Sequence, residues 1–304
     1  METLSTVQRV ALIGYGEVGR ILAEDLHSKG TAVAAFDLKH ADAALQAHAA
    51  AHGVELASHA ADALQDARLV ISAVTASQTV AVAEACALAW PQSAWFLDFN
   101  SASPGAKQRA AAIVEGAGGR YVEGAVMTSI PPYRMRVPLL LGGPHAAALL
   151  PLLTALGFVA SVASEKLGVA SATKMCRSVM IKGMEAMVIE SLTTARHYGV
   201  EDAVIASLHE TFPSIDWNRQ AAYFFQRVIE HGRRRSEEVR EVAATVREAG
   251  LEPWSAAGTA KRQAWMADLA DNGLFGQRGD PGFARSADWR AEADRILAMA
   301  GKGA

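Results

Sequence analysis

The sequence predicts an α/β fold of the Rossmann type, a doubly wound and mostly parallel sheet, followed by an all-helical C-terminal domain. The first half of the chain alternates short apolar runs with Ala-rich helical runs, and this alternation requires crossover connections between parallel strands. A glycine-rich turn follows the first apolar run. Beyond about residue 163 the strand pattern stops and only helical periodicity remains.

The size and composition suit two globular domains. The chain has 304 residues, of which 51% are hydrophobic and 20% charged, with a formal net charge of −3, so we expect neither disorder nor nucleic-acid binding. The start of the chain lacks a secretory signal, and the longest apolar runs are too short to span a membrane. The two cysteines lack metal-ligand spacing. We therefore expect no metal site, no membrane partner and a cytoplasmic location.

The first domain, residues 1–163, is expected to contain the sheet. Its predicted strands are Val7–Ile13, Ala32–Phe36, Arg68–Val74, Trp95–Phe99, Tyr121–Val126, Val137–Leu141 and Phe158–Val162. Helices are predicted at Val18–Ser28, Ser77–Trp90 and Pro104–Glu115. Because crossover helices pack on both faces of such a sheet, this domain is expected to have three layers.

The second domain, residues 164–304, is expected to be helical. A long helix is predicted from Leu167 to Tyr198, since this stretch has no proline and ends at Gly199. Further helices are predicted at Glu201–Leu208, Ile215–Glu230, Ser236–Ala249 and Trp254–Asn272. The arginine run at 233–235 is interpreted as a solvated helix end, with an anion-binding site as the alternative.

The turn Gly14-Tyr15-Gly16-Glu17-Val18-Gly19 is the first candidate site. It lies between a predicted strand and a predicted helix, the context in which GxGxxG binds the pyrophosphate of a dinucleotide. In that role Gly14 permits the tight turn, Gly16 lets the backbone approach the pyrophosphate, and Gly19 lets the helix pack on the strand. We expect all six residues to bind the cofactor; a purely structural turn is the alternative.

The second predicted strand ends at Asp37, an acidic residue about where dinucleotide-binding domains place one. Its carboxylate would accept hydrogen bonds from the adenosine ribose and repel a 2′-phosphate, so we expect NAD as the cofactor. Lys39 and His40 lie close enough to keep NADP as an alternative.

Two later strand ends should border the same crevice, because ligands of doubly wound sheets bind beyond the carboxyl ends of the strands. Val74 and Thr75 are expected beside the nicotinamide ribose. At the next strand end, Ser103 should cap the following helix. Asn100 and Ser101 precede it; we expect Asn100 to contact the cofactor and Ser101 the substrate.

The start of the long helix carries the candidate catalytic residue, Lys174. Helical spacing places small residues and two cations on one face, namely Ala170, Ser171, Lys174, Arg177, Ser178 and Ile181. Oxidation of an alcohol needs a group that takes up one proton, and burial together with the charge of Arg177 would lower the lysine pKa toward that task. Arg177 would hold a substrate carboxylate. The alternative is a solvated surface lysine.

The opposite face of this helix is expected to be core. It carries Val169, Thr173, Cys176, Met180, Gly183, Met184 and Met187. Methionines at helical spacing are usually packing residues, and a lone cysteine is usually a small apolar one.

On these motifs the sequence resembles the β-hydroxyacid dehydrogenase superfamily, which includes 6-phosphogluconate and 3-hydroxyisobutyrate dehydrogenases. The resemblance covers roughly residues 7–200 and rests on the glycine turn, the Asp98…Ser101…Pro104 loop and the segment Gly168–Ser178. It implies that Lys174 is the catalytic lysine and that the chain belongs to a subgroup with a helical C-terminal domain of unknown function. Ser178 stands where the family has an asparagine, and Ala170 replaces a glycine.

The substrate loop departs from the family pattern. Where the family has Asp-x-Pro-x-Ser-Gly-Gly, this chain has Glu123–Ser129 followed by two prolines, which argues against the family's standard substrates. The residues that the resemblance and the helical spacing assign to substrate orientation are Ser101, Met127, Thr128, Ser129, Arg177 and Ser178.

The expected function is an NAD(P)-dependent oxidoreductase that transfers a hydride between nicotinamide and a small hydroxy-acid-like substrate. An imine reductase of the same two-domain plan and a non-catalytic NAD-responsive regulatory protein are the alternatives. The resemblance also implies a homodimer. The aromatic residues of the second domain suit an interface, a substrate pocket or the domain core equally well.

Overall fold

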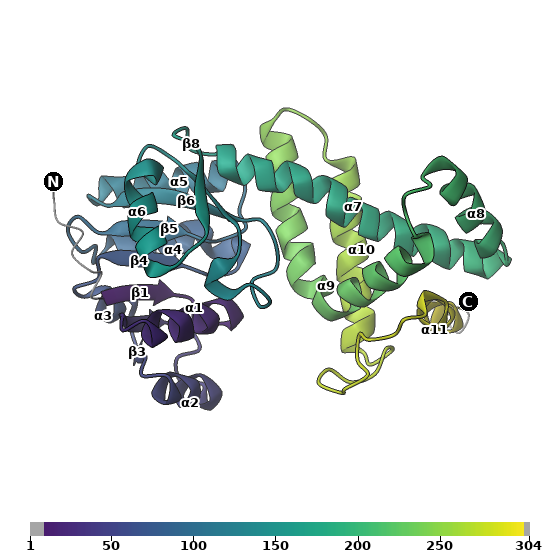
Figure 1. The fold of residues 1–304 in the computed structure, drawn as a ribbon, viewed down its shortest axis with the longest axis horizontal. Helices are drawn as coiled ribbons and strands as arrows, with labels where there is room; N and C mark the ends of the chain where they lie inside the picture. Colours follow the sequence, from purple (N-terminus) through teal and green to yellow (C-terminus); the bar gives the residue numbers. More distant parts are fainter. Residues whose placement is uncertain (1–8, 301–304) are drawn as a thin grey trace. The chain divides into compact units, whose positions relative to one another are not determined.

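The computed structural model of the chain describes residues 9–300. Its backbone contacts divide the chain into two compact units, residues 1–175 and 176–304, which are described separately (Figure 1). The sequence placed the boundary after residue 163. The division by contacts lies further along, within the long helix, because the first turns of that helix bind to the sheet of the first unit.

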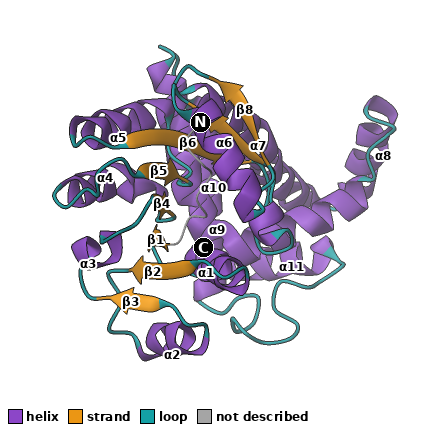
Figure 2. Ribbon diagram, turned by 60° about the vertical axis from the view of Figure 1, so that its left-hand side comes forward, coloured by secondary structure: helices purple, strands orange, loops and turns teal. Residues whose placement is uncertain are grey.

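The first unit is built on one eight-stranded sheet with the strand order β3-β2-β1-β4-β5-β6-β7-β8 (Figure 2). The strands are β1 (Arg9–Ile13), β2 (Ala32–Phe36), β3 (Glu55–Ala57), β4 (Leu69–Ser72), β5 (Trp95–Asp98), β6 (Arg120–Val126), β7 (Leu139–Gly142) and β8 (Ala160–Ser164). Neighbouring strands are parallel except for β6 and β7. The strand order reverses between β1 and β4, where doubly wound sheets bind nucleotides.

Helices cover both faces of this sheet. They are α1 (Glu17–Ser28), α2 (Ala43–Ala51), α3 (Ala60–Leu64), α4 (Thr79–Ala87), α5 (Pro104–Gly116) and α6 (Ala146–Leu156), with 3₁₀ turns η1 (Ala76–Gln78) and η2 (Arg134–Arg136). Successive residues of β1 belong to two different core clusters, Val10 and Leu12 to one and Ala11 and Ile13 to the other. This alternation follows from the two-residue period of a strand that is buried on both faces.

The predicted fold class is confirmed. The sequence did not predict β3, α2, α3 and α6 in this unit, nor the last helix of the second unit, Trp289–Ala300. The edge strand β3 is too short to show a pattern. Helix α6 is apolar almost throughout and contains Pro151, so it lacks the alternation of polar and apolar faces and includes a residue that usually ends a helix.

The second unit consists of helices. Helix α7 (Val169–Tyr198) enters it from the first unit and is followed by α8 (Glu201–Thr211), α9 (Trp217–Glu248), α10 (Trp254–Asp271) and α11 (Trp289–Ala300). The two helices predicted between residues 215 and 249 are helical in the structure, but the break predicted between them is wrong, since α9 is continuous. Gly232 lies within α9 where α10 packs closely against it. A Cβ at this position would lie 2.8 Å from the carbonyl oxygen of Gln263.

The arginine run lies in the middle of α9, so its interpretation as a helix end is wrong. Arg233 Nη2 lies 2.6 Å from Asp268 Oδ1 and 2.7 Å from Asp271 Oδ2 on α10. Arg235 is buried and forms an ion pair with the fully buried Glu185 of α7. The run therefore ties α9 to both neighbouring helices.

Aromatic side chains divide between the core and the surface of the second unit. Trp217, Phe225 and Trp289 belong to its hydrophobic core, whereas Tyr223 and Trp254 are exposed.

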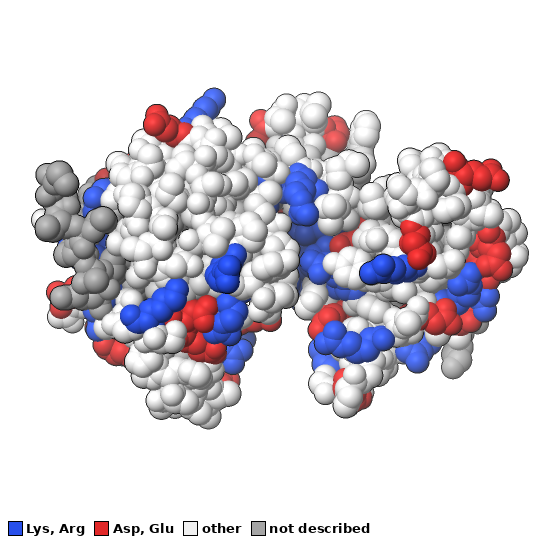
Figure 3. Space-filling view, viewed as in Figure 1, with Lys and Arg blue, Asp and Glu red and all other residues white. Residues whose placement is uncertain are grey.

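On the face drawn in Figure 3, basic and acidic side chains are interspersed. Within the described part of the chain, no helix combines the length and apolar character needed to cross a bilayer.

The buried Glu185 generates a prediction about stability. Besides Arg235, its Oε2 accepts a hydrogen bond of 3.1 Å from Gln263 Nε2, and its Oε1 lies 3.5 Å from Arg227 Nε. Glu185→Ala would leave the buried Arg235 without its counterion. We expect the free energy of unfolding in urea to fall by about 3–5 kcal/mol.

Glu190→Ala is the matched control, because Glu190 lies on the same helix and pairs with Arg262 while its side chain is 64% exposed. We expect this variant to lose less than about 1 kcal/mol. Equal losses in the two variants would contradict the importance of the buried pair.

Candidate active site

The glycine turn lies between β1 and α1, where the strand order reverses. Gly14 has φ = +100°, and a Cβ there would lie 2.5 Å from the carbonyl oxygen of Ala73. A Cβ on Gly19 would lie 2.1 Å from the carbonyl oxygen of Gly14. At Gly16, the N-cap of α1, a Cβ would meet no described heavy atom within 4 Å. This open space at a helix N-terminus, where the first N–H groups lack helical partners, fits a pyrophosphate.

The other three residues of the turn lie differently. Glu17 is exposed and Val18 half-buried in the first turn of α1. The Tyr15 side chain is fully buried, so a cofactor contact from this residue would have to come from its main chain. Burial raises the pKa of Tyr15 to about 12, and its neutral hydroxyl lies 3.0 Å from His48 Nδ1.

Asp37 directly follows β2, beside the glycine turn. Its Oδ2 accepts a hydrogen bond of 2.8 Å from the backbone N–H of Tyr15, and its Oδ1 accepts one of 2.9 Å from that of Lys39. Two backbone donors therefore fix the orientation of the carboxylate. Each oxygen retains acceptor capacity, which leaves the group able to accept hydrogen bonds from a ribose.

A buried polar network forms at the end of β5 around Asp98. Lys107 Nζ lies 2.8 Å from Asp98 Oδ1, and the Tyr121 hydroxyl donates to Asp98 Oδ2 at 2.6 Å. All three side chains are almost completely buried. Burial and the neighbouring Asp98 hold the pKa of Tyr121 well above its usual value, so the hydroxyl remains a donor. Sequence reasoning missed this network because a lysine on an exposed helix face and one on a buried face look alike.

Asn100 continues this network toward β4. Its N–H donates to Asp98 Oδ1 at 2.8 Å, its Nδ2 donates to Ser72 Oγ at 2.9 Å, and its Oδ1 accepts from the N–H of Val74 at 2.8 Å. The side chain is buried and engaged within the protein. Asn100 therefore positions the backbone at Val74, next to the exposed Thr75, and direct contact of its amide with the cofactor stays a prediction.

A second buried carboxylate holds the start of α7. Glu123 of β6 accepts hydrogen bonds through Oε1 from the N–H groups of Gly168, at 2.8 Å, and Ala170, at 3.1 Å. Its Oε2 accepts from Ser171 Oγ at 2.7 Å. Glu123 pairs with Gly142 of β7 in the sheet, and a Cβ on that glycine would lie 2.2 Å from Glu123 Oε1. A strand residue thus caps the N-terminus of a helix, where negative charge is favourable.

Lys174 follows one turn later and is half-buried. Its Nζ donates a hydrogen bond of 2.6 Å to Ser101 Oγ, just beyond the end of β5. The structure therefore brings together two residues that the sequence assigned to catalysis and to substrate binding. Arg177, which is exposed, and Ser178, which is buried, lie on the next turn of α7 in the second unit.

The predicted core face of α7 holds at Gly183, which is buried, and at Met184, which packs against the core of the second unit, but is wrong at four other positions. Thr173 and Cys176 are exposed, as are Met180, at 65%, and Met187, at 64%. Charged residues occupy the buried face instead: Lys182 lies 2.6 Å from Glu238 of α9, and Glu185 pairs with Arg235. Charged residues of α7 are buried because charged residues of α9 pair with them. The polarity of the α7 side chains therefore did not predict which of its faces is buried.

The loop after β6 contains the half-buried Met127 and Ser129 and the exposed Thr128. Its far end is attached to α1 through Arg134, whose Nη2 lies 2.7 Å from Glu24 Oε2 and whose Nε lies 2.7 Å from Asp25 Oδ1. Partial burial opposes ionisation of Glu24, but hydrogen bonds from Arg134 and His48 outweigh it and lower the pKa of this carboxyl.

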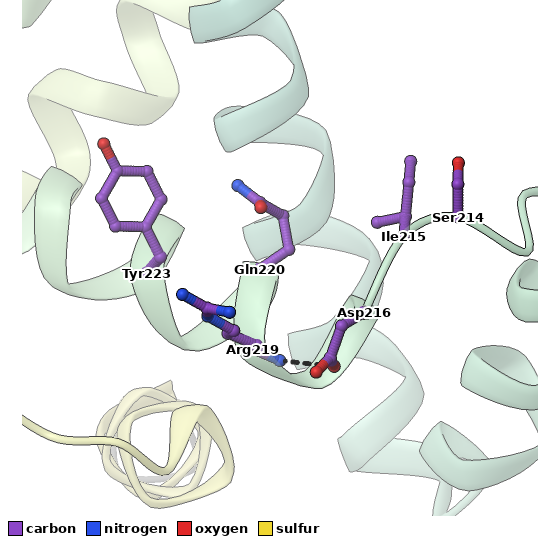
Figure 4. A pocket seen from close by; sticks show the side chains of 6 residues that line it. All are labelled: Ser214, Ile215, Asp216, Arg219, Gln220 and Tyr223. Carbon is purple, nitrogen blue, oxygen red and sulfur yellow. Dashed lines mark hydrogen bonds between the residues drawn. The ribbon is translucent and has the colours of Figure 1, made fainter.

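A surface hollow lies elsewhere, at the N-terminus of α9 in the second unit (Figure 4). It is lined by Ser214, Ile215, Asp216, Arg219, Gln220 and Tyr223. Asp216 caps α9 by accepting a hydrogen bond of 3.1 Å from the N–H of Arg219. The hollow contains none of the predicted site residues, so the candidate active site is the one around Lys174.

Comparison with known proteins agrees with both units. Residues 9–157 match the NAD binding domain of 6-phosphogluconate dehydrogenase, and residues 195–266 match a domain of unknown function, DUF1932. A conserved hypothetical protein from Sinorhizobium meliloti 1021 is 35% identical, with 97% of each chain covered and a TM-score of 0.74. The chain belongs to the 6-phosphogluconate dehydrogenase-like superfamily. The predicted resemblance is thereby confirmed, as is the predicted subgroup with a helical C-terminal domain of unknown function. The first unit is an NAD(P)-binding domain.

More distant members of known activity share this fold. A 3-hydroxyisobutyrate dehydrogenase from Mycobacterium tuberculosis is 17% identical over 96% of this chain and 99% of its own, with a TM-score of 0.69. A reductive aminase from Aspergillus terreus, in complex with NADPH and ethyl levulinate, is 16% identical over 97% and 100% of the two chains, with a TM-score of 0.56.

The cap that Glu123 provides can be tested by Glu123→Ala. This change would leave the buried N–H groups of Gly168 and Ala170 without their side-chain acceptor, while the Ser171 hydroxyl could still donate to the carbonyl oxygen of Gly168. We expect the free energy of unfolding in urea to fall by about 2 kcal/mol or more. Glu165→Ala, which removes an exposed carboxylate just before α7, should change it by less than about 0.5 kcal/mol; a similar loss in both variants would argue against the cap.

Proposed function

We propose that this protein is an NAD(P)-dependent oxidoreductase that oxidises an alcohol carbon of a small hydroxy-acid-like substrate, or reduces the matching carbonyl, with Lys174 as the catalytic acid and base. The observation that carries the proposal is the hydrogen bond of 2.6 Å between Lys174 Nζ and Ser101 Oγ. It places a lysine amine beside a hydroxyl just beyond the carboxyl end of a strand, in a domain that binds NAD(P).

The proposed proton chemistry belongs to Lys174. Bound nicotinamide supplies the hydride acceptor in oxidation and the hydride donor in reduction. In oxidation the neutral amine of Lys174 takes the hydroxyl proton as the substrate carbon loses its hydride, so the alcohol becomes a carbonyl and the lysine an ammonium. In reduction the ammonium returns that proton to the developing alkoxide. Ser101 orients the amine and replaces the substrate hydroxyl as its hydrogen-bond partner when no substrate is bound.

Substrate orientation is assigned to residues on three segments, of which the loop after β5 contributes Ser101. Met127, Thr128 and Ser129 follow β6, and Arg177 and Ser178 follow Lys174 on α7. The guanidinium of Arg177 suits a carboxylate, which it would bind through two parallel hydrogen bonds. The departure of the loop from the family pattern supports a substrate other than 6-phosphogluconate or hydroxyisobutyrate. We also propose a homodimer, as the family resemblance implies.

NAD is the proposed cofactor because Asp37 directly follows β2 beside the glycine turn, and a carboxylate there would accept hydrogen bonds from the adenosine ribose. Asp37→Ser should weaken NAD binding by about 10- to 100-fold, since the ribose loses its charged acceptor, and should improve NADP binding relative to NAD. Isothermal titration calorimetry with NAD and with NADP measures both affinities. Glu84→Gln removes one negative charge from an exposed position of the same unit and should change neither; an unaltered NAD affinity in Asp37→Ser would refute the assignment.

The substrate class is tested by following nicotinamide absorbance with NAD or NADP and a panel of hydroxy acids, polyols and cyclic imines. Turnover of hydroxy acids supports the proposal. Turnover of imines alone would favour the reductive aminase and imine reductase branch of this fold. Binding of cofactor without turnover on the whole panel would favour a regulatory protein.

The role of Lys174 is tested by Lys174→Ala. We expect kcat to fall by about 10²- to 10⁴-fold, the contribution of one positioned acid–base group, while the affinity for NAD stays unchanged. Lys166→Ala, which removes an exposed lysine just before α7, should keep full turnover. If Lys174→Ala turned over substrate at the normal rate, another group would have to handle the proton.

A further inference from the structure

Two histidines and a carboxylate come together on the outer side of the nucleotide-binding unit. His48 and His52 lie four residues apart on α2 and its C-cap, so they share one face of the helix. Glu24 lies on α1, which packs beside them. One ligand atom of each residue lies within 4.8 Å of the other two, and all three side chains are half-buried. None of the three is required by the proposed oxidoreductase chemistry.

The spacing of these atoms suits a small divalent metal. His48 Nε2 and Glu24 Oε1 are 3.0 Å apart. In a tetrahedral zinc site, nitrogen and oxygen ligands at about 2.0–2.2 Å from the metal stand about 3.3 Å from one another. All three ligand atoms lie within 4.8 Å of one another, so side-chain rotation, including reorientation of the two imidazole rings, which now lie 30° from parallel, would bring them around one ion. Two imidazole nitrogens with one carboxylate oxygen form a ligand set that zinc and neighbouring transition metals prefer.

The groups behind the ligands support the same conclusion. The Tyr15 hydroxyl lies 3.0 Å from His48 Nδ1, the nitrogen away from Glu24. A metal-bound histidine usually donates a hydrogen bond from its other ring N–H to an acceptor oxygen, which fixes the ring orientation. Arg134 Nη2 binds Glu24 Oε2 at 2.7 Å and leaves Oε1 facing the histidines. Hydrogen bonds on the sides facing away from the site therefore fix the orientation of His48 and Glu24.

A metal here would also have a structural consequence for α2. Only Ala49 of this helix is fully buried, so apolar packing secures it weakly. An ion bound by Glu24 of α1 and by His48 and His52 would join α2 to α1 directly.

We propose that Glu24, His48 and His52 form a binding site for one divalent transition-metal ion of the zinc type, with water completing the coordination. The spacing of the two cysteines alone predicted no metal site. The His-x-x-x-His spacing on one helix was the available signal, but the carboxylate comes from another helix and is invisible in the local sequence.

The site can be tested with Zn²⁺ and Co²⁺ on the metal-free full-length chain without a histidine tag. We expect titration to give one Zn²⁺ per chain, and saturating Zn²⁺ to raise the Tm by about 5–10 °C. The Co²⁺ complex should show the visible absorption of a nitrogen- and oxygen-ligated site. It should lack the thiolate charge-transfer band that binding at the exposed Cys176 would add.

Variants separate this site from others. His52→Ala should weaken Zn²⁺ binding by more than about 100-fold, whereas Tyr15→Phe, which removes only the group behind His48, should weaken it by about 10-fold. His209→Ala removes an exposed histidine of α8 and should bind Zn²⁺ normally. Circular dichroism of each metal-free variant checks that it folds.

Two results would overturn the proposal. One is the absence of saturable Zn²⁺ binding to the folded parent chain, which would leave these residues as a hydrogen-bonded cluster alone. The other is Zn²⁺ binding of unchanged affinity in the folded His52→Ala variant, which would place the ion elsewhere. Because neither test uses turnover, the outcome is independent of the oxidoreductase assignment.

Discussion

Two buried carboxylates at adjacent positions of the sheet organise the candidate active site. Asp98 of β5 and Glu123 of β6 are register partners, and both are completely buried. Neighbouring negative charges in an apolar interior are costly unless each is compensated. Here the compensation differs: Asp98 is paired with Lys107 and Tyr121, whereas Glu123 caps the N-terminus of α7. Each carboxylate thereby fixes a different part of the site.

The hydrogen bonds of Asp98 and Glu123 position three segments that are far apart in the sequence: the end of β4, the loop after β5 and the start of α7. From Asp98, hydrogen bonds lead through Asn100 to the backbone at Val74, beyond the end of β4. From Glu123, the cap determines where α7 begins and hence where Lys174 stands. The Lys174–Ser101 hydrogen bond then joins the helix to the loop after β5. Groups that are held by buried, fully formed hydrogen bonds keep their geometry, which acid–base chemistry requires.

The helical unit uses buried charge in another way. Ion pairs between α7 and α9 take the place of part of an apolar interface: Glu185 with Arg235, and Lys182 with Glu238. Burial of Lys182 lowers its pKa, although Glu238 acts in the opposite direction. Losing one member of a buried pair costs more than the pair contributes, so these contacts specify which faces of the helices meet. They also explain why α9 runs unbroken through its arginines.

The sequence by itself determined the fold class, the glycine turn, Asp37 and the family. These features depend on local patterns: alternating strands and helices, a GxGxxG turn between a strand and a helix, and an acid at a strand end. The lysine motif at the start of α7 was likewise readable because its residues are consecutive along one helix.

Only the tertiary structure decided what distant residues do to one another. In the fold, Asn100 positions the backbone at Val74, and Lys107 and Tyr121 bind Asp98. On α7, Lys182 and Glu185 are buried, whereas Met180 and Met187 are exposed. Glu24 lies beside His48 and His52. Burial of a polar group depends on a partner elsewhere in the chain, and one sequence does not reveal that partner. The local chemistry could therefore be predicted from the sequence, while the contacts that position it required the fold.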